Sequence, residues 1–301
     1  MDNVIMLFAC LAIGMALRWF QRVPDNAHTS LNAFIIHVSL PAVTLLQIHA
    51  VHLAPALLYA VLMPWLLFTA SAALFWLVGS ALRLPPTTTG ALAVVGGLGN
   101  TSFIGLPMIE SFYGSSGMPV GIMIDQLGTY LVLSTIGIFV ICHYSDTAVS
   151  PREIAKRIVT FPPLIALVIA AALMPVSYPD WVVSVLNRLG GTLAPLALVS
   201  VGLQLRPGAL RGNRGPLAMG LGYKLVLAPL LITLVYAGAI GLRGPTTQVT
   251  LFEAAMAPQI GGAIVAIQYG LNAQLISLMV GVGTVLSFIT LPLWWSAFSV
   301  L

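Results

Sequence analysis

The sequence predicts an all-α polytopic membrane protein with ten transmembrane helices, and two observations support this fold class. Hydrophobic residues make up 59% of the 301-residue chain and charged residues only 7%. The mean hydropathy of +1.01 is too high for a soluble domain. A spanning helix needs roughly 20 apolar residues, so about ten helices with short loops account for the whole length.

Ten apolar segments form two sets of five around a polar linker at 144–160, which we expect in the cytoplasm. The first set is 3–20, 28–48, 55–82, 86–113 and 118–143. The second set is 161–176, 181–205, 215–242, 246–269 and 273–300. We therefore expect one five-helix repeat at 1–143 and another at 161–301.

Basic residues set the orientation of these helices. Segment 3–20 follows Asp2, and its basic residues come after the apolar run, which is typical of a retained first helix with its N-terminus outside. Most loop cations then lie on the inner side: Arg18, Arg22, Arg83, Arg152, Lys156, Arg157, Arg206, Arg211 and Arg214. Arg188 and Arg243 lie on the outer side. We expect both termini on the periplasmic side of a bacterial inner membrane.

An odd number of helices in each half gives the two halves inverted topology, because the second half enters the bilayer from the opposite side. Short similarities support the pairing of the halves. The stretch 41–47 resembles 195–201, and 87–88 resembles 246–247. These matches occur in the same order in both halves, as an inverted repeat requires.

Two apolar segments are interrupted at corresponding positions, within 96–107 and 256–262. Glycine weakens a helix, and proline removes a backbone donor and clashes with the preceding turn. The predicted helix-breaking residues are Gly97, Gly99, Pro107, Pro258 and Gly262. Unpaired backbone groups survive at membrane depth only within protein or beside water, and paired interruptions indicate a transporter's binding site. The alternative is that these residues only let helices kink or pack closely.

The interruptions favour a small organic anion as ligand. A half-helix that begins after an interruption offers free N–H groups and a partial positive charge. Nearby side chains add hydrogen-bond donors, and the unwound backbone adds further contacts. The residues that we expect to bind substrate on these grounds are Asn100, Thr101, Ser102, Pro258, Gln259, Ile260 and Gly261.

The run 99–107, followed by Tyr113-Gly114, resembles the fourth-helix signature of the auxin efflux carrier family, which includes bacterial malonate and malate permeases. The resemblance continues through Lys224, Pro229, 256–258 and 291–294 and covers essentially the whole chain. It implies a fold like that of the bile-acid sodium symporters. Helices one, two, six and seven would form a scaffold that dimerises, and helices 3–5 and 8–10 a transport domain that moves like an elevator.

The same resemblance places Asn100 and Pro258 where the two interrupted helices cross, and Gln126 at a polar position that lines the site of the plant carriers. The sequence also departs from the plant pattern. Segment 55–82 contains no acidic residue, and the long central loop of many plant members is missing. Auxin is therefore a poor candidate substrate.

Charged residues inside predicted helices are costly and usually face a cavity or a partner. Glu253 could hold a sodium ion or carry a proton, as a similarly placed glutamate does in the bile-acid symporters, or it could pair with Lys224. Lys224 could instead attract the substrate carboxylate. Glu110 and Asp125 are expected nearer the outer face. Neighbours on an α-helix differ by about 100°, so Asp125 and Gln126 are expected on different faces.

Several functions are excluded or left as rivals. Cys10 and Cys142 match no metal or redox motif and are interpreted as structural; His49 and His52 have no carboxylate nearby. We expect no enzyme activity, no metal centre, no cofactor beyond a sodium ion or proton, and no nucleic acid partner. The expected partners are membrane lipids, a second copy of the chain and a mono- or dicarboxylate. A channel and a membrane-embedded anion sensor are the alternatives to a carrier.

Overall fold

The computed structural model describes residues 2–48, 55–145, 150, 152, 155–156, 159–204 and 213–301. Within these ranges the chain is helical apart from short connections, as the composition predicted. The one described β-type pairing is an isolated antiparallel bridge between Gly99 and Pro258. His49, His52, Arg157, Arg206 and Arg211, which entered the predictions above, lie outside the described residues.

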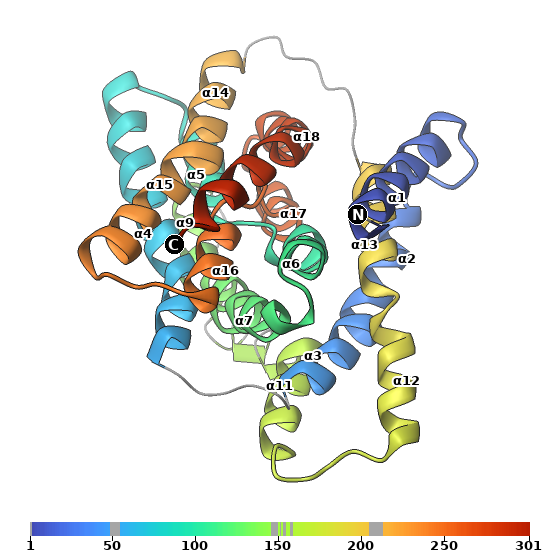
Figure 1. The fold of residues 1–301 in the computed structure, drawn as a ribbon. Coiled ribbons are helices and arrows are strands. Elements are labelled where there is room, and N and C mark those ends of the chain that lie inside the picture. The colour runs from blue at the N-terminus through green and yellow to red at the C-terminus, as the bar shows by residue number, and fades with distance from the viewer. Residues whose placement is uncertain are drawn as a thin grey trace. The chain divides into compact units, whose positions relative to one another are not determined.

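The chain divides into two compact units, which are described separately (Figure 1). Unit 1 comprises Met1–Leu53, Ser102–Ile122 and Arg157–Leu205. Its helices include α1 (Asp2–Trp19), α2 (Ala27–Phe34), the π-helix η1 (Ile35–Ser39), α3 (Leu40–Ile48), α6 (Leu106–Tyr113), the 3-10 helix η3 (Ser115–Gly117), α11 (Pro162–Ala172), α12 (Asp180–Gly190) and α13 (Leu193–Gln204).

Unit 2 comprises Ala54–Thr101, Met123–Lys156 and Arg206–Leu301. Its α-helices are α4 (Pro55–Leu82), α5 (Pro86–Gly97), α8 (Tyr130–Val132), α9 (Ile138–His143), α14 (Arg214–Gly222), α15 (Ala228–Ile232), α16 (Pro245–Ala254), α17 (Ile260–Gln268) and α18 (Ala273–Phe298). Its π-helices are η4 (Ile124–Thr129), η5 (Leu133–Gly137), η6 (Tyr223–Leu227) and η7 (Thr233–Ala239). Two elements run across the unit boundaries, the π-helix η2 (Thr101–Gly105) and α7 (Met118–Met123).

In unit 1, α1 packs directly against α13 through two glycines. A Cβ atom built on Gly202 would lie 2.9 Å from the Met15 nitrogen and 3.0 Å from the Gly14 Cα, both backbone atoms. Small residues of this kind let membrane helices approach until their backbones touch. Figure 1 shows α1 and α13 side by side in this part of the fold.

In unit 2, α5 lies at the centre and is buried on every side. All of its residues from Thr88 to Gly97 are buried, which agrees with its lack of a polar face. α4 packs along it, and the Ser71 hydroxyl donates to the Ala93 carbonyl at 2.9 Å. A Cβ on Gly97 would lie 3.0 Å from Phe68 and Ser71 atoms, so this glycine allows α4 to approach α5 closely.

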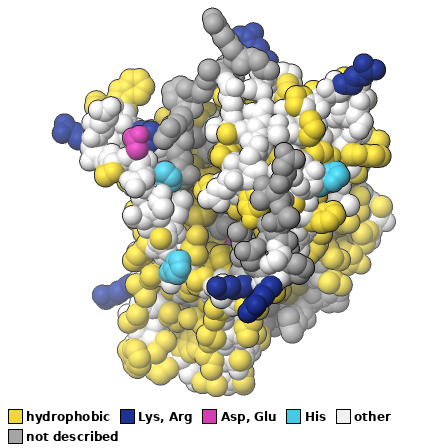
Figure 2. All heavy atoms as spheres, turned by 180° about the vertical axis from the view of Figure 1, so that it is seen from behind, with side chains coloured by type: hydrophobic (Ala, Val, Ile, Leu, Met, Phe, Trp, Pro, Cys, Tyr) yellow, Lys and Arg dark blue, Asp and Glu magenta, His cyan; other side chains and the backbone are white. Residues whose placement is uncertain are grey.

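Six described stretches are long and apolar enough to cross a membrane, judged by length and composition: Ala27–Ile48, Ala56–Leu82, Ser115–His143, Asp180–Leu203, Arg214–Ala239 and Ala273–Phe298. Shorter apolar helices occur at Phe8–Trp19 and Pro162–Ala172. Many large hydrophobic side chains are exposed, and Figure 2 shows one face on which hydrophobic side chains cover wide areas and charged ones are few. The protein is therefore a multi-pass membrane protein.

The fourth predicted segment is interrupted over fewer residues than expected. The extended backbone spans only 98–100, and helical backbone resumes at Thr101 in η2 and continues through α6. Pro107 is therefore helical. It follows the π-helix η2 directly, and local π-helical turns are one way in which a membrane helix accommodates proline. In the ninth segment the extended backbone lies within 255–259, and we name the two segments 98–100 and 255–259 together the crossing.

The close contact of α1 with α13 makes Gly202 sensitive to substitution. Gly202→Ala should destabilise the protein by about 1–3 kcal/mol, because the added methyl group meets backbone atoms that cannot rotate away. Gly222→Ala is the matched control, since nothing lies within 4 Å of a Cβ at that helical glycine. Thermal unfolding in detergent should show a lower Tm for Gly202→Ala alone; equal Tm values for both variants would contradict the packing described.

Candidate functional site

The two segments of the crossing supply hydrogen bonds to each other. The Asn100 N–H donates to the Ala257 carbonyl at 2.7 Å, and the Gln259 N–H donates to the Leu98 carbonyl at 3.0 Å. These bonds replace some of the backbone hydrogen bonds within helices that both segments lose at this point. Extended backbone is thereby accommodated in a buried position inside an apolar bundle.

Most of the residues expected to bind substrate lie within or next to the crossing. Those that are buried there are Asn100, Thr101, Pro258, Gln259 and Ile260. Gly261 is half-buried in the first turn of α17, and Gln126 is fully buried in η4. Ser102 is half-buried, and the boundary between the two units falls between it and Thr101.

The predicted helix-breaking residues differ in their local roles. Gly99 and Pro258 form the bridge in the centre of the crossing. Gly97 is the last residue of α5, and Gly262 lies in the first turn of α17. A Cβ on Gly262 would come 2.9 Å from the Gln259 side-chain oxygen, so this glycine leaves room for that amide.

Helix α17 begins at the crossing and directs its N-terminus toward it. Gln259 is the residue before the helix, with extended backbone, and the first N–H to donate back within the helix is that of Ala263, to the Gln259 carbonyl at 3.2 Å. The N–H groups of the preceding turn are the donors that a helix leaves without internal partners. Nothing lies within 4 Å of a Cβ at Gly261, so the first turn of α17 is uncovered on the side of this residue.

Asp125 also lies at the crossing, although the sequence reasoning placed it away from the site. Its carboxylate accepts a hydrogen bond from the Thr101 hydroxyl at 2.6 Å, and only 3% of the residue is exposed. Asp125 and Gln126 are both buried because the stretch Ser115–His143 is buried along most of its length. Neighbouring residues on it can therefore both be buried although they point to different faces. A carboxylate within an apolar span was the signal that could have identified Asp125.

Two further charged groups are buried beside the crossing. Lys224 in η6 is 1% exposed, and its ammonium group donates to the Ala254 carbonyl at 3.0 Å. Glu253 is also 1% exposed, and within the described chain neither of its carboxylate oxygens has a hydrogen-bond partner. No ion pair joins Lys224 to Glu253 among the residues described. Lys224 contacts the main chain at the end of α16 instead.

Helix α18 packs against the crossing at Gly283. A Cβ on this residue would lie 2.7 Å from Cδ and 2.9 Å from Cγ of Pro258. Glycine is therefore needed where the α18 helix passes the proline ring. The sequence reasoning missed Gly283, because a glycine in an uninterrupted apolar segment resembles many others that have only packing roles.

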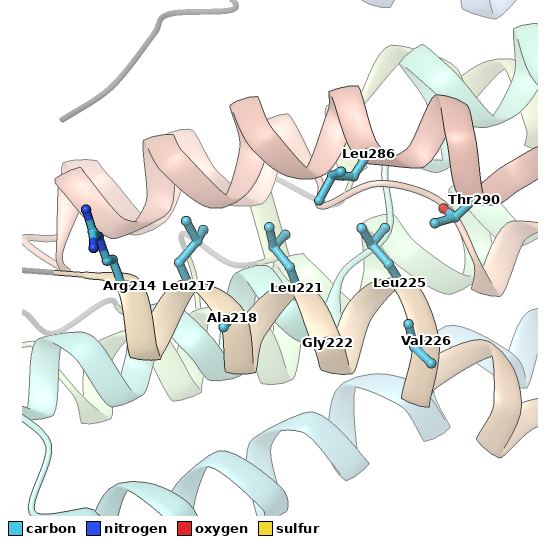
Figure 3. Close-up of a pocket in the computed structure, with 9 residues that line it drawn as sticks. All are labelled: Arg214, Leu217, Ala218, Leu221, Gly222, Leu225, Val226, Leu286 and Thr290. Carbon is cyan, nitrogen blue, oxygen red and sulfur yellow. The ribbon is translucent and has the colours of Figure 1, made fainter. Parts of the chain in front are cut away.

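A separate groove of about 520 Å³ runs between α18 and the helical stretch formed by α14 and η6 (Figure 3). It is lined by Arg214, Leu217, Ala218, Leu221, Gly222, Leu225, Val226, Leu286 and Thr290. None of the predicted site residues lines it, and its walls are almost entirely apolar. A small carboxylate would lack hydrogen-bond partners along most of this groove, so the crossing is the better candidate site.

Comparison with known proteins agrees with this architecture. Residues 1–295 match the profile of a family described as membrane transport protein. An uncharacterized transporter of Methanothermobacter thermautotrophicus is 27% identical over 97% of this chain and 96% of its own length. An uncharacterized transporter of Methanocaldococcus jannaschii is 24% identical over 98% of this chain and 97% of its own. These matches confirm the resemblance inferred from the motifs, and the chain belongs to the membrane transport protein family.

Proposed function

We propose that this protein is a secondary transporter that moves small organic anions, mono- or dicarboxylates, across the bacterial inner membrane. The observation that carries the proposal is the crossing, where α17 begins with backbone N–H groups that have no partner within the helix. A carboxylate there would accept hydrogen bonds from the backbone N–H groups of the first turn and gain from the helix dipole. Asn100 and Gln259 would orient it. A small anion would fit between the apolar side chains that surround the crossing.

The proposed mechanism is an elevator movement of a transport domain against a dimeric scaffold. The contact-based division supports it, because helices of the first, second, sixth and seventh predicted segments fall in unit 1. Unit 2 holds the crossing and most of the remaining helices. In this mechanism unit 2 would carry the bound anion, and α17 and α5 would travel together through the hydrogen bonds of the crossing.

Coupling to a cation through Glu253 is the second candidate. The observation in its favour is that both carboxylate oxygens of this buried residue have no hydrogen-bond partner in the described structure. A buried carboxylate in this condition costs several kcal/mol unless a cation or proton compensates it. A channel or a sensor would use the same site differently.

Flux of labelled malonate and malate into proteoliposomes tests the proposal. A carrier should show saturable uptake and countertransport, whereas a channel should show flux without countertransport. Binding of these anions with no flux would favour the sensor, and the absence of both would reject this substrate class.

Asn100→Ala should weaken anion binding by about 1.5–3 kcal/mol, or roughly 10- to 100-fold in Kd, because one donor to a charged group is lost. The protein should remain folded, since the main-chain bond from Asn100 to Ala257 is kept. Calorimetry with malonate measures the effect. Asn187→Ala, at an exposed position of α12, is the control and should bind as the unmodified protein does. Unchanged affinity in Asn100→Ala would remove this residue from the site.

The inverted topology predicts that equivalent loops of the two halves face opposite sides of the membrane. In a cysteine-free background, Asp25→Cys should react with an impermeant maleimide only after the cells are opened. Ser177→Cys should react in intact spheroplasts. Both positions are exposed and lie between the first two predicted helices of their repeats. Labelling of both from the same side would exclude an inverted repeat.

A further inference from the structure

The ammonium group of Lys224 lies where the end of a half-helix needs a positive charge. Ala254 is the last residue of α16, and helix C-termini carry unpaired carbonyl groups and a partial negative charge. The carbonyls of Phe252 and Glu253 accept from the N–H groups of Ala255 and Met256. The carbonyl of Ala254 accepts from Lys224 at 3.0 Å.

The same ammonium group also reaches the other segment of the crossing. A Cβ on Gly99 would lie 3.2 Å from the Lys224 nitrogen and 3.6 Å from its Cε. Gly99 has no side chain, so the ammonium group can approach the backbone of 98–100 while it binds the end of α16. One cation therefore binds the end of α16 and lies beside the other segment of the crossing.

Lys224 is a buried cation near two buried carboxyl groups, those of Glu253 and Asp125. Glu253 interacts electrostatically with Lys224 and with Asp125, whose carboxylate receives the Thr101 hydroxyl. Helices α4 and α18, which also pack on α16, contain no Asp, Glu, Lys, Arg or His along their described lengths. The crossing thus combines one ammonium group with two carboxyl groups in a position closed to solvent.

Transporters with interrupted helices bind their coupling cation with unwound carbonyls and the C-terminal ends of half-helices. Here the carbonyl at the C-terminal end of α16 is already bound by a side chain, the ammonium group of Lys224. We propose that Lys224 is a tethered counter-cation that takes the place of a mobile sodium ion at the crossing, so that anion transport is independent of sodium. The transport part of this inference rests on the function proposed above, whereas the occupancy of the cation position does not.

Removal of the Lys224 side chain should create a site for a free cation. Lys224→Ala removes the ammonium group and three methylene groups, and the space that they leave is bordered by the Ala254 carbonyl and lies within electrostatic reach of the Glu253 carboxyl group. These oxygen ligands suit a small monovalent cation, and the remaining carboxylates favour one electrostatically. The variant should therefore acquire a cation site that the unmodified protein lacks.

Thermal unfolding in detergent tests this without any transported anion. Protein is compared in choline, sodium and ammonium chloride at equal ionic strength. The unmodified protein should unfold at the same temperature in all three salts. Lys224→Ala should unfold at a lower temperature in choline and recover with sodium or ammonium in a saturable, concentration-dependent manner. Lys224→Ala combined with Glu253→Gln should lose this response.

Arg214→Ala, which removes a cation from the exposed end of α14, is the matched control and should show no cation response. Sodium stabilisation of the unmodified protein that Glu253→Gln abolishes would overturn the inference, as would a folded Lys224→Ala with no cation response. If Lys224→Ala does not fold in any salt, the unfolding temperature of the unmodified protein is measured against sodium concentration. No change with sodium supports the inference, and a rise that Glu253→Gln abolishes overturns it. Malonate uptake that depends on sodium would refute the role of Lys224 as a tethered cation but would support the transporter function. A cation response of Lys224→Ala without any malonate uptake by the unmodified protein would support the role of Lys224 but would count against the transporter function.

Discussion

Backbone hydrogen bonding at membrane depth is the constraint on which the rest of unit 2 depends. The helical backbone is interrupted in both segments of the crossing. Each N–H or carbonyl group left without a hydrogen bond in hydrocarbon would cost several kcal/mol. The bonds from Asn100 to Ala257 and from Gln259 to Leu98 meet part of this need. The helices that lead into the crossing, α5 and α16, are accordingly buried over most of their lengths, because protein must surround the extended segments.

The energies involved explain why charged side chains lie next to the crossing. A lysine in the centre of a bilayer costs about 2.5–3.5 kcal/mol or more. A favourable interaction with one helix end contributes at most about 2 kcal/mol. The contact with Ala254 therefore cannot stabilise Lys224 alone. The carboxyl group of Glu253, which interacts electrostatically with Lys224, is a second favourable neighbour of the ammonium group.

The sequence predicted the helical segments well, because an apolar run of about 20 residues has few other stable forms in a membrane. It also located the interruptions, since glycine and proline have strong local effects. It overestimated the first interruption because the chain accommodates Pro107 within a continuous helix, directly after the π-helix η2. It missed Asp125 because it assumed that this helix has one buried face, whereas the helix is buried on several sides. It missed Gly283 because close packing against Pro258 depends on contacts distant in sequence.

The π-helical stretch η4 also bears on how such chains can change in length. An extra residue in an α-helix turns every later side chain by about 100°, which would rotate the buried face of the following helix toward lipid. A π-turn spreads one additional residue over a wider loop of backbone and restores the original phase afterwards. A single-residue deletion within η4 would therefore return this stretch to α-helical turns without changing which side of α9 is buried.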